Sequence, residues 1–512
     1  MKRPLAVIGI TMFSVLFVLC GIGSMLLSLT VLFVSLLGFV LCMIIKKSRQ
    51  SAFLPTVFGS AAAACLLLFG FEFFFFLPAQ NLAVEKGEIT AVVLETPYES
   101  STGERLYFSA KITSVDGKSV NKKARLSFPN KLWKKNTPML PQETKQLEAG
   151  DRLNFIGKLY CIGEASPEIK SYYKSLNICL GAYPLSSVKV EKKAVKNLFT
   201  LLAKERKKAI NQILSAFDGD RAGLLISLLT GSKNYVSKEL YSSFKAAGSA
   251  HIMAVSGLHL SVWISFILDF LRKRNALTKG KIVLLMLFVF LVMFFASFSG
   301  SVKRAGVMML LYLFSKLFGE ESDRLNSLGF SAVCVLFQNP YSAVNAGFVL
   351  SFLSVLTIIL IALPLSNAVF LKIKQKLASK RGAAVIRTLI SSVFISFFIT
   401  LETLPFQIWY FSGFSLVGVL TNLLLLPFAA PAVVLGGLYV MFYFVPLLSK
   451  VLFILSGFAL MCCEKITVFT SSFPLPFATL SKQAVWAAAV VSAFSAVLLL
   501  RFIKKKKLSD YI

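Results

Sequence analysis

Histidine and acidic residues are scarce in this chain. Its 512 residues include 2 histidines and 24 acidic residues, against 55 lysines and arginines. Metal-dependent hydrolysis needs clusters of His and Asp around an ion, and two histidines cannot supply them. The phosphate-binding pattern G-x-x-x-x-G-K-[ST] is also missing. We therefore expect no metal, no cofactor and no ATP-binding loop in this chain, and no catalytic residues of that kind.

Apolar residues, by contrast, are abundant. They make up 56% of the sequence, more than a soluble domain of this length could bury. Several apolar runs approach or exceed the roughly 18–20 residues that cross a bilayer; they lie at 25–45, 53–77, 282–298, 343–363 and 484–503. The sequence predicts a polytopic α-helical membrane protein with about eleven transmembrane helices.

Basic clusters predict the orientation of these helices, because short cytoplasmic loops carry an excess of Lys and Arg. Such clusters lie at 2–3, 46–49, 272–274, 372–387 and 504–507. If all of them are cytoplasmic, both termini lie inside and three helices precede an outside segment. The net charge of +31 also favours a polyanionic partner, although positive-inside loops alone give basic membrane proteins.

The outside segment predicts a small extracytoplasmic all-β domain inserted after the third helix. Short β-branched and aromatic runs are separated by turn residues; they lie at 89–94, 106–115, 122–128, 152–160 and 179–190. Five strands suit an OB-like barrel. Cys161 and Cys179 are the two cysteines of this domain, and a disulfide between them is a candidate staple on an oxidising side.

Basic and aromatic residues are mixed in the same domain, as in proteins that hold single-stranded nucleic acid. The DNA-binding candidates are Lys122, Lys123, Arg125, Trp133, Lys134, Lys135 and Lys158. The alternative is a solvated face over a small core. The predicted organisation is N-terminal helices at 1–79, the β domain at 80–191, an amphipathic interfacial helix at 192–220, a membrane core at 221–435 and C-terminal helices with a basic tail at 436–512.

Both histidines lie in the stretch from Ala247 to Leu260, which we expect to lead into a helix running from His251 to Leu271. Four interpretations stay open for it. The histidines could share a metal only if the helix breaks at Ser256-Gly257; Ser256 and His259 could form a hydrolytic pair; the small residues could pack helices; or the polar residues could line a wet path.

Other polar residues also interrupt apolar segments, where each is costly unless buried or hydrated. The channel-lining candidates are His251, Ser256, Gly257, His259, Arg304, Asn345, Glu402, Gln407 and Asn422. A cationic lining would suit a polyanion. A salt bridge between Glu402 and Arg304 is the alternative for those two residues.

Several blocks resemble the ComEC competence family in order and spacing. The stretch Ala247–Leu260 is similar to that family's AGtxHllAvSGLHv block, and Gly150-Asp151-Arg152 to its GDrl turn. Further similar blocks lie at 299–308, 324–329, 338–340, 345–352 and 402–427. The chain departs from the usual d.gFqLSF at two positions, with Asn345 in place of the acid and Val349 in place of the glutamine.

The resemblance implies a channel that imports single-stranded DNA through the bacterial cytoplasmic (inner) membrane during natural transformation. It also implies partners: a DNA receptor, a competence pilus and a cytoplasmic helicase. Most family members carry a metallo-β-lactamase-like domain that this sequence lacks, so a separate nuclease is a further candidate partner, as is a second copy of the chain. The alternatives are a transporter or flippase of another anionic polymer or lipid, and a membrane-embedded hydrolase using Ser256 and His259.

Overall fold

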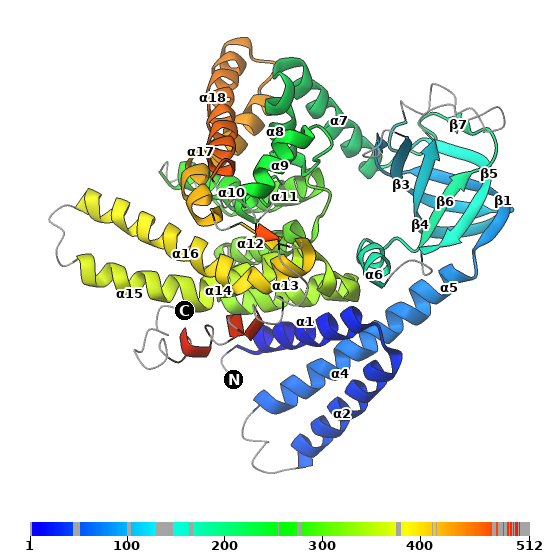
Figure 1. Ribbon diagram of the computed structural model, residues 1–512, viewed down its shortest axis with the longest axis horizontal. Coiled ribbons are helices and arrows are strands. Elements are labelled where there is room, and N and C mark those ends of the chain that lie inside the picture. The colour runs from blue at the N-terminus through cyan, green and yellow to red at the C-terminus, as the bar shows by residue number, and fades with distance from the viewer. Residues whose placement is uncertain are drawn as a thin grey trace. The chain divides into compact units, whose positions relative to one another are not determined.

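The computed structural model divides into two compact units, one of residues 1–209 with 332–345, the other of residues 210–331 with 346–512 (Figure 1). The structure describes residues 3–44, 52–99, 104–129, 147–162, 167–253, 255, 257–273, 278–374, 380–411, 413–415, 417–473, 478–479, 485, 489–490, 492–493, 495, 497–499 and 501.

Seven described helical segments are long and apolar enough to cross a bilayer: Pro4–Ile22, Met25–Ile44, Phe53–Gln80, Ala346–Ile373, Ile386–Phe411, Gly418–Met441 and Pro446–Ser471. They confirm a polytopic helical membrane protein. The number of about eleven stays a prediction. Helices α10 (Gly257–Lys273) and α11 (Lys279–Phe295) have 17 residues each, fewer than the roughly 20 that span the hydrocarbon core.

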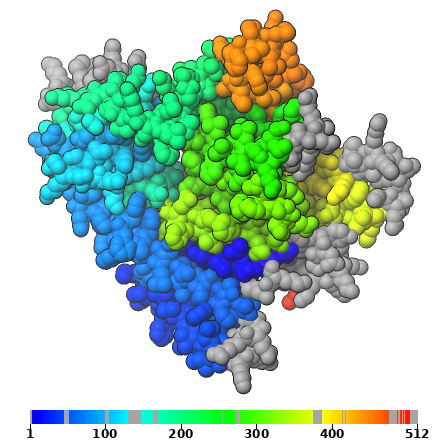
Figure 2. Space-filling model, turned by 180° about the vertical axis from the view of Figure 1, so that it is seen from behind, coloured from blue at the N-terminus to red at the C-terminus, as the bar shows by residue number. Residues whose placement is uncertain are grey.

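The first unit begins with the helices α1 (Pro4–Ile22), α2 (Met25–Ile44) and α4 (Phe53–Phe71). A π-helical turn, η1 (Glu72–Phe76), and the short helix α5 (Leu77–Gln80) continue α4 toward the first strand (Figure 1). Figure 2 shows the same passage from the N-terminal helices, in blue, to the β domain, in cyan.

The β domain is a closed, OB-like barrel, as predicted. Its strands are β1 (Val84–Val93), β2 (Tyr98–Glu99), β3 (Arg105–Val115), β4 (Lys118–Pro129), β5 (Arg152–Cys161), β6 (Leu180–Pro184) and β7 (Lys189–Glu191). They are ordered β1-β3-β4-β6-β5, and β5 pairs back to β1. The strand predicted over 179–190 is therefore two strands. Because side chains alternate across a strand, Phe108, Phe128 and Phe155 point inward and fill the core.

The turn before β5 joins the barrel to the chain that follows it. Gly150 has φ +96, and a Cβ there would lie 2.7 Å from the carbonyl oxygen of Val195. Asp151 is fully buried; its carboxylate accepts the amides of Glu148 and Lys193, each at 2.9 Å, and the Lys192 ammonium at 3.1 Å. The Gly-Asp turn thus has a structural role, since it fixes the linker to helix α7 (Leu198–Ala216).

A second buried cluster attaches the barrel to the membrane helices of the same unit. Lys174, on helix α6 (Pro167–Ser175), lies 2.5 Å from Glu72 Oε1 in the π turn and 3.0 Å from the Tyr341 hydroxyl. Tyr341 belongs to η4 (Pro340–Val344), where Asn339 Nδ2 also donates to the Lys174 carbonyl at 2.7 Å. Burial lowers the pKa of Lys174, while the Glu72 carboxylate opposes that change by favouring the ammonium.

The second unit is helical. After the end of α7 it contains α8 (Gly219–Thr230), α9 (Lys238–Ala246), α10, α11, α12 (Gly300–Phe318), the start of α13 (Arg324–Gln338), α14 (Ala346–Thr357), the π turn η5 (Ile358–Ala362), α15 (Leu363–Lys374), α16 (Lys380–Phe411), α17 (Gly418–Met441) and α18 (Pro446–Ser471). Strand β8 (Gly413–Phe414) pairs with β9 (Ala478–Thr479) at the break between α16 and α17.

We expect Asp151→Ala to loosen the barrel. It leaves two buried amides and a lysine without their acceptor, which costs about 2–4 kcal/mol. Hydrogen–deuterium exchange of the full chain in detergent should show amides of β1 and β5 exchanging roughly 30-fold faster or more. Asp218→Ala is the control, because Asp218 is exposed and its side chain makes no capping bond. Equal exchange in both variants would contradict the structural role of Asp151.

Candidate functional site

The histidine-containing stretch is a loop followed by a helix. Helix α9 ends at Ala246, Gly248 takes the left-handed conformation (φ +72), and His251 to Met253 form a turn. Helix α10 begins only at Gly257. The predicted helix start at His251 was therefore wrong, because the left-handed glycine directs the chain out of one helix before the next can begin.

Gly248 packs against the break between α16 and α17. A Cβ on Gly248 would lie 2.8 Å from Ser415 Cβ and 2.9 Å from Gly418 Cα. Ser415 Oγ donates to the carbonyl oxygen of Ala246 at 2.7 Å. Two interrupted segments, far apart in sequence, are thus held in direct backbone contact, and only glycine fits at position 248 without strain.

Gly257 packs against a buried arginine. A Cβ on Gly257 would lie 2.8 Å from Arg304 Nη2 and 3.1 Å from Ala305 Cβ. Arg304 lies on α12, is 4% exposed, and donates from Nε to Ser351 Oγ of α14 at 3.0 Å. Three of the family-like blocks, at 247–260, 299–308 and 345–352, therefore meet at one guanidinium.

No carboxylate of the described residues lies within ion-pair distance of Arg304. Glu402, the predicted alternative partner, instead accepts the hydroxyls of Ser492 at 3.0 Å and Ser495 at 2.8 Å. A buried cation is costly unless an anion or polar groups compensate it. The electrostatics of Arg304 therefore favour an anionic ligand.

The remaining candidates of the membrane core are dispersed. His251 is exposed and His259 is buried on α10. Gln407 Nε2 donates to Thr403 Oγ1 at 2.7 Å, while Asn422 Oδ1 is buried without a hydrogen-bond partner among the described residues. Ser256 lies outside the described residues, so a Ser256–His259 pair stays a prediction.

Asn345 belongs to the first unit, where its amide donates to Ser175 Oγ of α6 at 3.0 Å. It therefore helps to attach the barrel helix. Among the described residues, no group of three or more His, Cys, Asp or Glu side chains is placed to hold a metal ion.

The DNA-binding candidates of the barrel differ in their contacts. Lys122 donates to the Phe75 carbonyl at 2.8 Å, and Lys158 forms a 2.7 Å ion pair with Glu85. Lys123 pairs across strands with Lys111, and the Arg125 guanidinium lies 4.2 Å from the ring centroid of Tyr107. Local contacts thus engage three of these candidates, Lys122, Lys158 and Arg125. Trp133, Lys134 and Lys135 lie outside the described residues.

The two cysteines of the barrel carry free thiols. Cys161 Sγ lies 3.7 Å from the Cys179 carbonyl oxygen, and burial raises the pKa of Cys179 to about 11. The predicted disulfide is not formed in this structure. An oxidised form stays a prediction.

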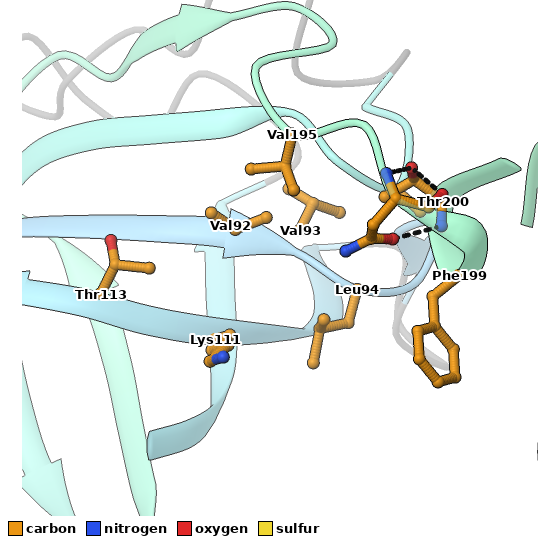
Figure 3. Close-up of a pocket in the computed structure, with 10 residues that line it drawn as sticks. Val92, Val93, Leu94, Lys111, Thr113, Val195, Phe199 and Thr200 are labelled. Atoms are coloured by element: carbon orange, nitrogen blue, oxygen red, sulfur yellow. Dashed lines mark hydrogen bonds between the residues drawn. The ribbon is translucent and has the colours of Figure 1, made fainter. Parts of the chain in front are cut away.

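A shallow pocket lies where β1 and β3 meet the start of α7 (Figure 3). Val92 and Val93 line it from β1, Leu94 from the residue after that strand, and Phe199 and Thr200 from α7. Asn197 and Thr200 cap this helix reciprocally with two 2.9 Å bonds, so the helix start is satisfied internally. The largely apolar lining points to packing between barrel and helix.

Ser351 and Ser415 were not among the predicted site residues, although Ser351 contacts Arg304 and Ser415 contacts the carbonyl of Ala246. Ser351 could have been predicted from the sequence, because it is a polar residue in the apolar run that contains the 345–352 block. Ser415 could not, since only the folded chain shows which carbonyl its hydroxyl meets.

A family model described as "Competence protein" matches residues 228–506. The chain is 30% identical over 224 residues to "ComE operon protein 3" of Bacillus subtilis (strain 168), covering 44% of this chain and 26% of that protein. It is 26% identical over 212 residues to "Recombination protein 2" of Haemophilus influenzae, covering 40% and 26%. The match thus spans about a quarter of each relative. No solved structure matches the chain.

We expect Gly248→Ala to destabilise the second unit by about 1–3 kcal/mol, because it combines a strained backbone with overlap against Ser415. The thermal midpoint of the purified chain in detergent should fall. Gly280→Ala is the matched control, since Gly280 is helical and has open space around its Cα; its midpoint should stay level or rise. A Gly248→Ala midpoint equal to that of the control would refute the close contact.

Proposed function

The chain belongs to the competence protein family, and from this premise we propose that it is the membrane channel that imports single-stranded DNA during natural transformation. The matched residues 228–506 contain the whole site around Gly248, Gly257 and Arg304. The helices long enough to cross a bilayer support a passage through the membrane.

The observation that carries the proposal is the isolated positive charge of Arg304. A guanidinium matches the geometry of a phosphate and binds it with charge-assisted hydrogen bonds. With no carboxylate beside it among the described residues, each passing phosphate can take the place of a counter-ion. Conduction needs sites that bind well enough to admit a charged group and weakly enough to release it, and a single arginine meets both conditions.

Access to this charge is controlled by the start of α10. Gly257 covers Nη2 of Arg304 so closely that even one methyl group would contact it. The described residues before α10 include the left-handed Gly248, and a shift of this loop together with the start of α10 would uncover the guanidinium. We propose that entry of the DNA strand displaces this loop and that the backbone breaks near the site permit the movement.

The channel needs an external source of movement. We propose that a DNA receptor and a competence pilus deliver the strand outside, and that a cytoplasmic helicase draws it inward. A separate nuclease would remove the strand that is not imported. The expected inner-membrane orientation places the barrel on the outer side, where it would meet incoming DNA first.

Arg304→Gln should lower transformation of the bacterium that encodes the chain by roughly ten- to hundredfold. Loss of a charge-assisted hydrogen bond of about 1.5–3 kcal/mol gives that factor. Arg304→Lys keeps the charge but not the fork of donors, so its transformation should be intermediate. The measurement is the number of transformants after adding chromosomal DNA, normalised to the membrane content of the protein.

Lys316→Gln, on the same helix, is the control for Arg304, because Lys316 is exposed; its transformation should match that of the parent strain. Wild-type transformation by Arg304→Gln, at wild-type protein content, would refute the role of this arginine. A thermal midpoint of the purified variant within a few degrees of wild type would separate loss of transport from loss of folding.

Deletion of the gene should abolish transformation by added DNA and leave DNA bound at the cell surface. The reason is that binding precedes membrane passage, so a missing channel stops the strand after its capture. Surface-bound radiolabelled DNA and the number of transformants are measured in the same culture. Normal transformation in a deletion strain without a paralogue would refute the channel.

A further inference from the structure

The outer face of the barrel carries a cluster of tyrosines. Six of the 14 tyrosines of the chain lie there, about twice as many as an even distribution would place in residues 80–191. We call this set the tyrosine face; it consists of Tyr98 on β2, Tyr107 on β3, Tyr160 on β5, Tyr183 on β6, and Tyr172 and Tyr173 on α6.

Strand pairing brings these rings together. Tyr98 pairs directly with Tyr107, and their ring centroids lie 6.1 Å apart. The rings of Tyr160 and Tyr183 are 6.2 Å apart, and those of Tyr172 and Tyr173 are 5.4 Å apart. The three pairs come from different elements, so the face exists only in the folded barrel.

Arg125 joins the pairs. Its guanidinium lies 4.2 Å from the Tyr107 ring centroid and 5.2 Å from that of Tyr173, and Nη2 donates to the Tyr98 hydroxyl at 3.4 Å. No carboxylate of the described residues lies within ion-pair distance of it. The tyrosine face therefore contains a cation whose charge no described acid neutralises.

Gly181 lets one ring lie flat on the sheet. It stands between Arg125 and Tyr160 in the strand ladder. A Cβ at Gly181 would lie within 3 Å of the Tyr160 ring and hydroxyl, and these are its three nearest atoms. The ring of Tyr160 thus covers the glycine, with its outer side turned to solvent.

The rings remain accessible. Tyr98 and Tyr160 are each 36% exposed and Tyr172 is 55% exposed. The outward positions between the rings on β3 and β4 are polar, with Ser109 opposite Arg125 and Ser127 opposite Tyr107. A surface embedded in lipid would place aliphatic side chains at these positions. A polar face with exposed rings is suited instead to a ligand with flat, hydratable surfaces and negative charge.

We propose that the tyrosine face binds single-stranded nucleic acid by stacking unpaired bases on Tyr98, Tyr160 and Tyr172, with Arg125 holding the adjacent phosphates. This inference rests on the proposed function and gives that function a receiving surface. A single strand offers the face of each base to an aromatic ring, whereas in a duplex the neighbouring base pairs cover it. The site thus prefers the strand that a channel can admit.

The test uses the full chain in nanodiscs of neutral lipid and compares two fluorescent probes of equal length and charge. One is oligo-dT, and the other is an abasic oligonucleotide that keeps the phosphates and lacks the bases. Because the chain is basic everywhere, phosphate contacts alone would bind both probes. We expect the wild-type chain to bind oligo-dT at least fivefold more tightly than the abasic probe.

Tyr98→Ala, Tyr160→Ala and Tyr172→Ala should each reduce this preference, by roughly five- to hundredfold if a whole base is unstacked. Binding of the abasic probe should stay unchanged. Tyr235→Ala and Tyr241→Ala are the matched controls, because these tyrosines are similarly exposed, at 38% and 37%, and lie outside the barrel. Both controls should keep the wild-type preference.

Gly181→Ala tests the geometry without removing a ring. Its methyl group would push the Tyr160 ring away from the sheet and should weaken oligo-dT binding. In the Tyr160→Ala background the same substitution should have no further effect, because the ring it displaces is gone. An equal effect of Gly181→Ala in both backgrounds would show that it acts on the fold of the barrel.

Equal affinity of the wild-type chain for both probes, or wild-type preference in all three tyrosine variants, would overturn the proposal. So would a tighter association of the tyrosine face with anionic vesicles than with oligo-dT, measured by loss of vesicle binding in the same variants. Transformation by the Arg304 variants is scored separately. If the three tyrosine variants keep the wild-type preference for oligo-dT while the Arg304→Gln strain loses transformation, the proposed channel stands and only the proposed tyrosine face is refuted.

Discussion

A buried arginine on α12 is the constraint on which the proposed site depends. Arg304 must be desolvated because α10, α12 and α14 close around it, and the contact with Ser351 satisfies one of its donors. Such a group is retained at a cost in stability, which a purely structural helix contact would avoid with an apolar residue. The close packing around Arg304 also explains the glycine at position 257, because any larger residue would displace either the start of α10 or the guanidinium.

The buried charges of the barrel are paired, in contrast to that of Arg304. Asp151 and Lys174 are buried, but each has several partners within its own unit. Their contacts fix the barrel to its linker and to the membrane helices, as Glu148 does through Lys207, whose hydrogen bond holds the pKa of that carboxyl below its usual range. These buried contacts hold the barrel firmly, which suits the receiving role that we propose for it.

The sequence predicted the elements better than it predicted their contacts. Short β-branched and aromatic runs between turn residues identified five barrel segments. They did not locate the turn that separates β6 from β7. The helix expected at His251 began at Gly257, since only the folded chain shows that Gly248 is left-handed. Lys122 and Lys158 were predicted as DNA ligands from composition, and the folded chain adds contacts with Phe75 and Glu85. Their role in DNA binding stays a prediction, whereas register and long-range pairing decide the contacts that composition cannot give.

The shortage of acidic residues connects the two proposed sites. In the first unit, four acidic side chains each form an ion pair with a lysine and so hold a local or tertiary contact; they are Glu72, Glu85, Glu148 and Asp151. In the second unit, Glu464 pairs with Arg221, and Glu402 is held by serines. Arg125 and Arg304 are left without a described carboxylate. Because a guanidinium beside an acid would bind phosphate weakly, a chain that carries a polyanion benefits from having few acids and from placing them away from its path.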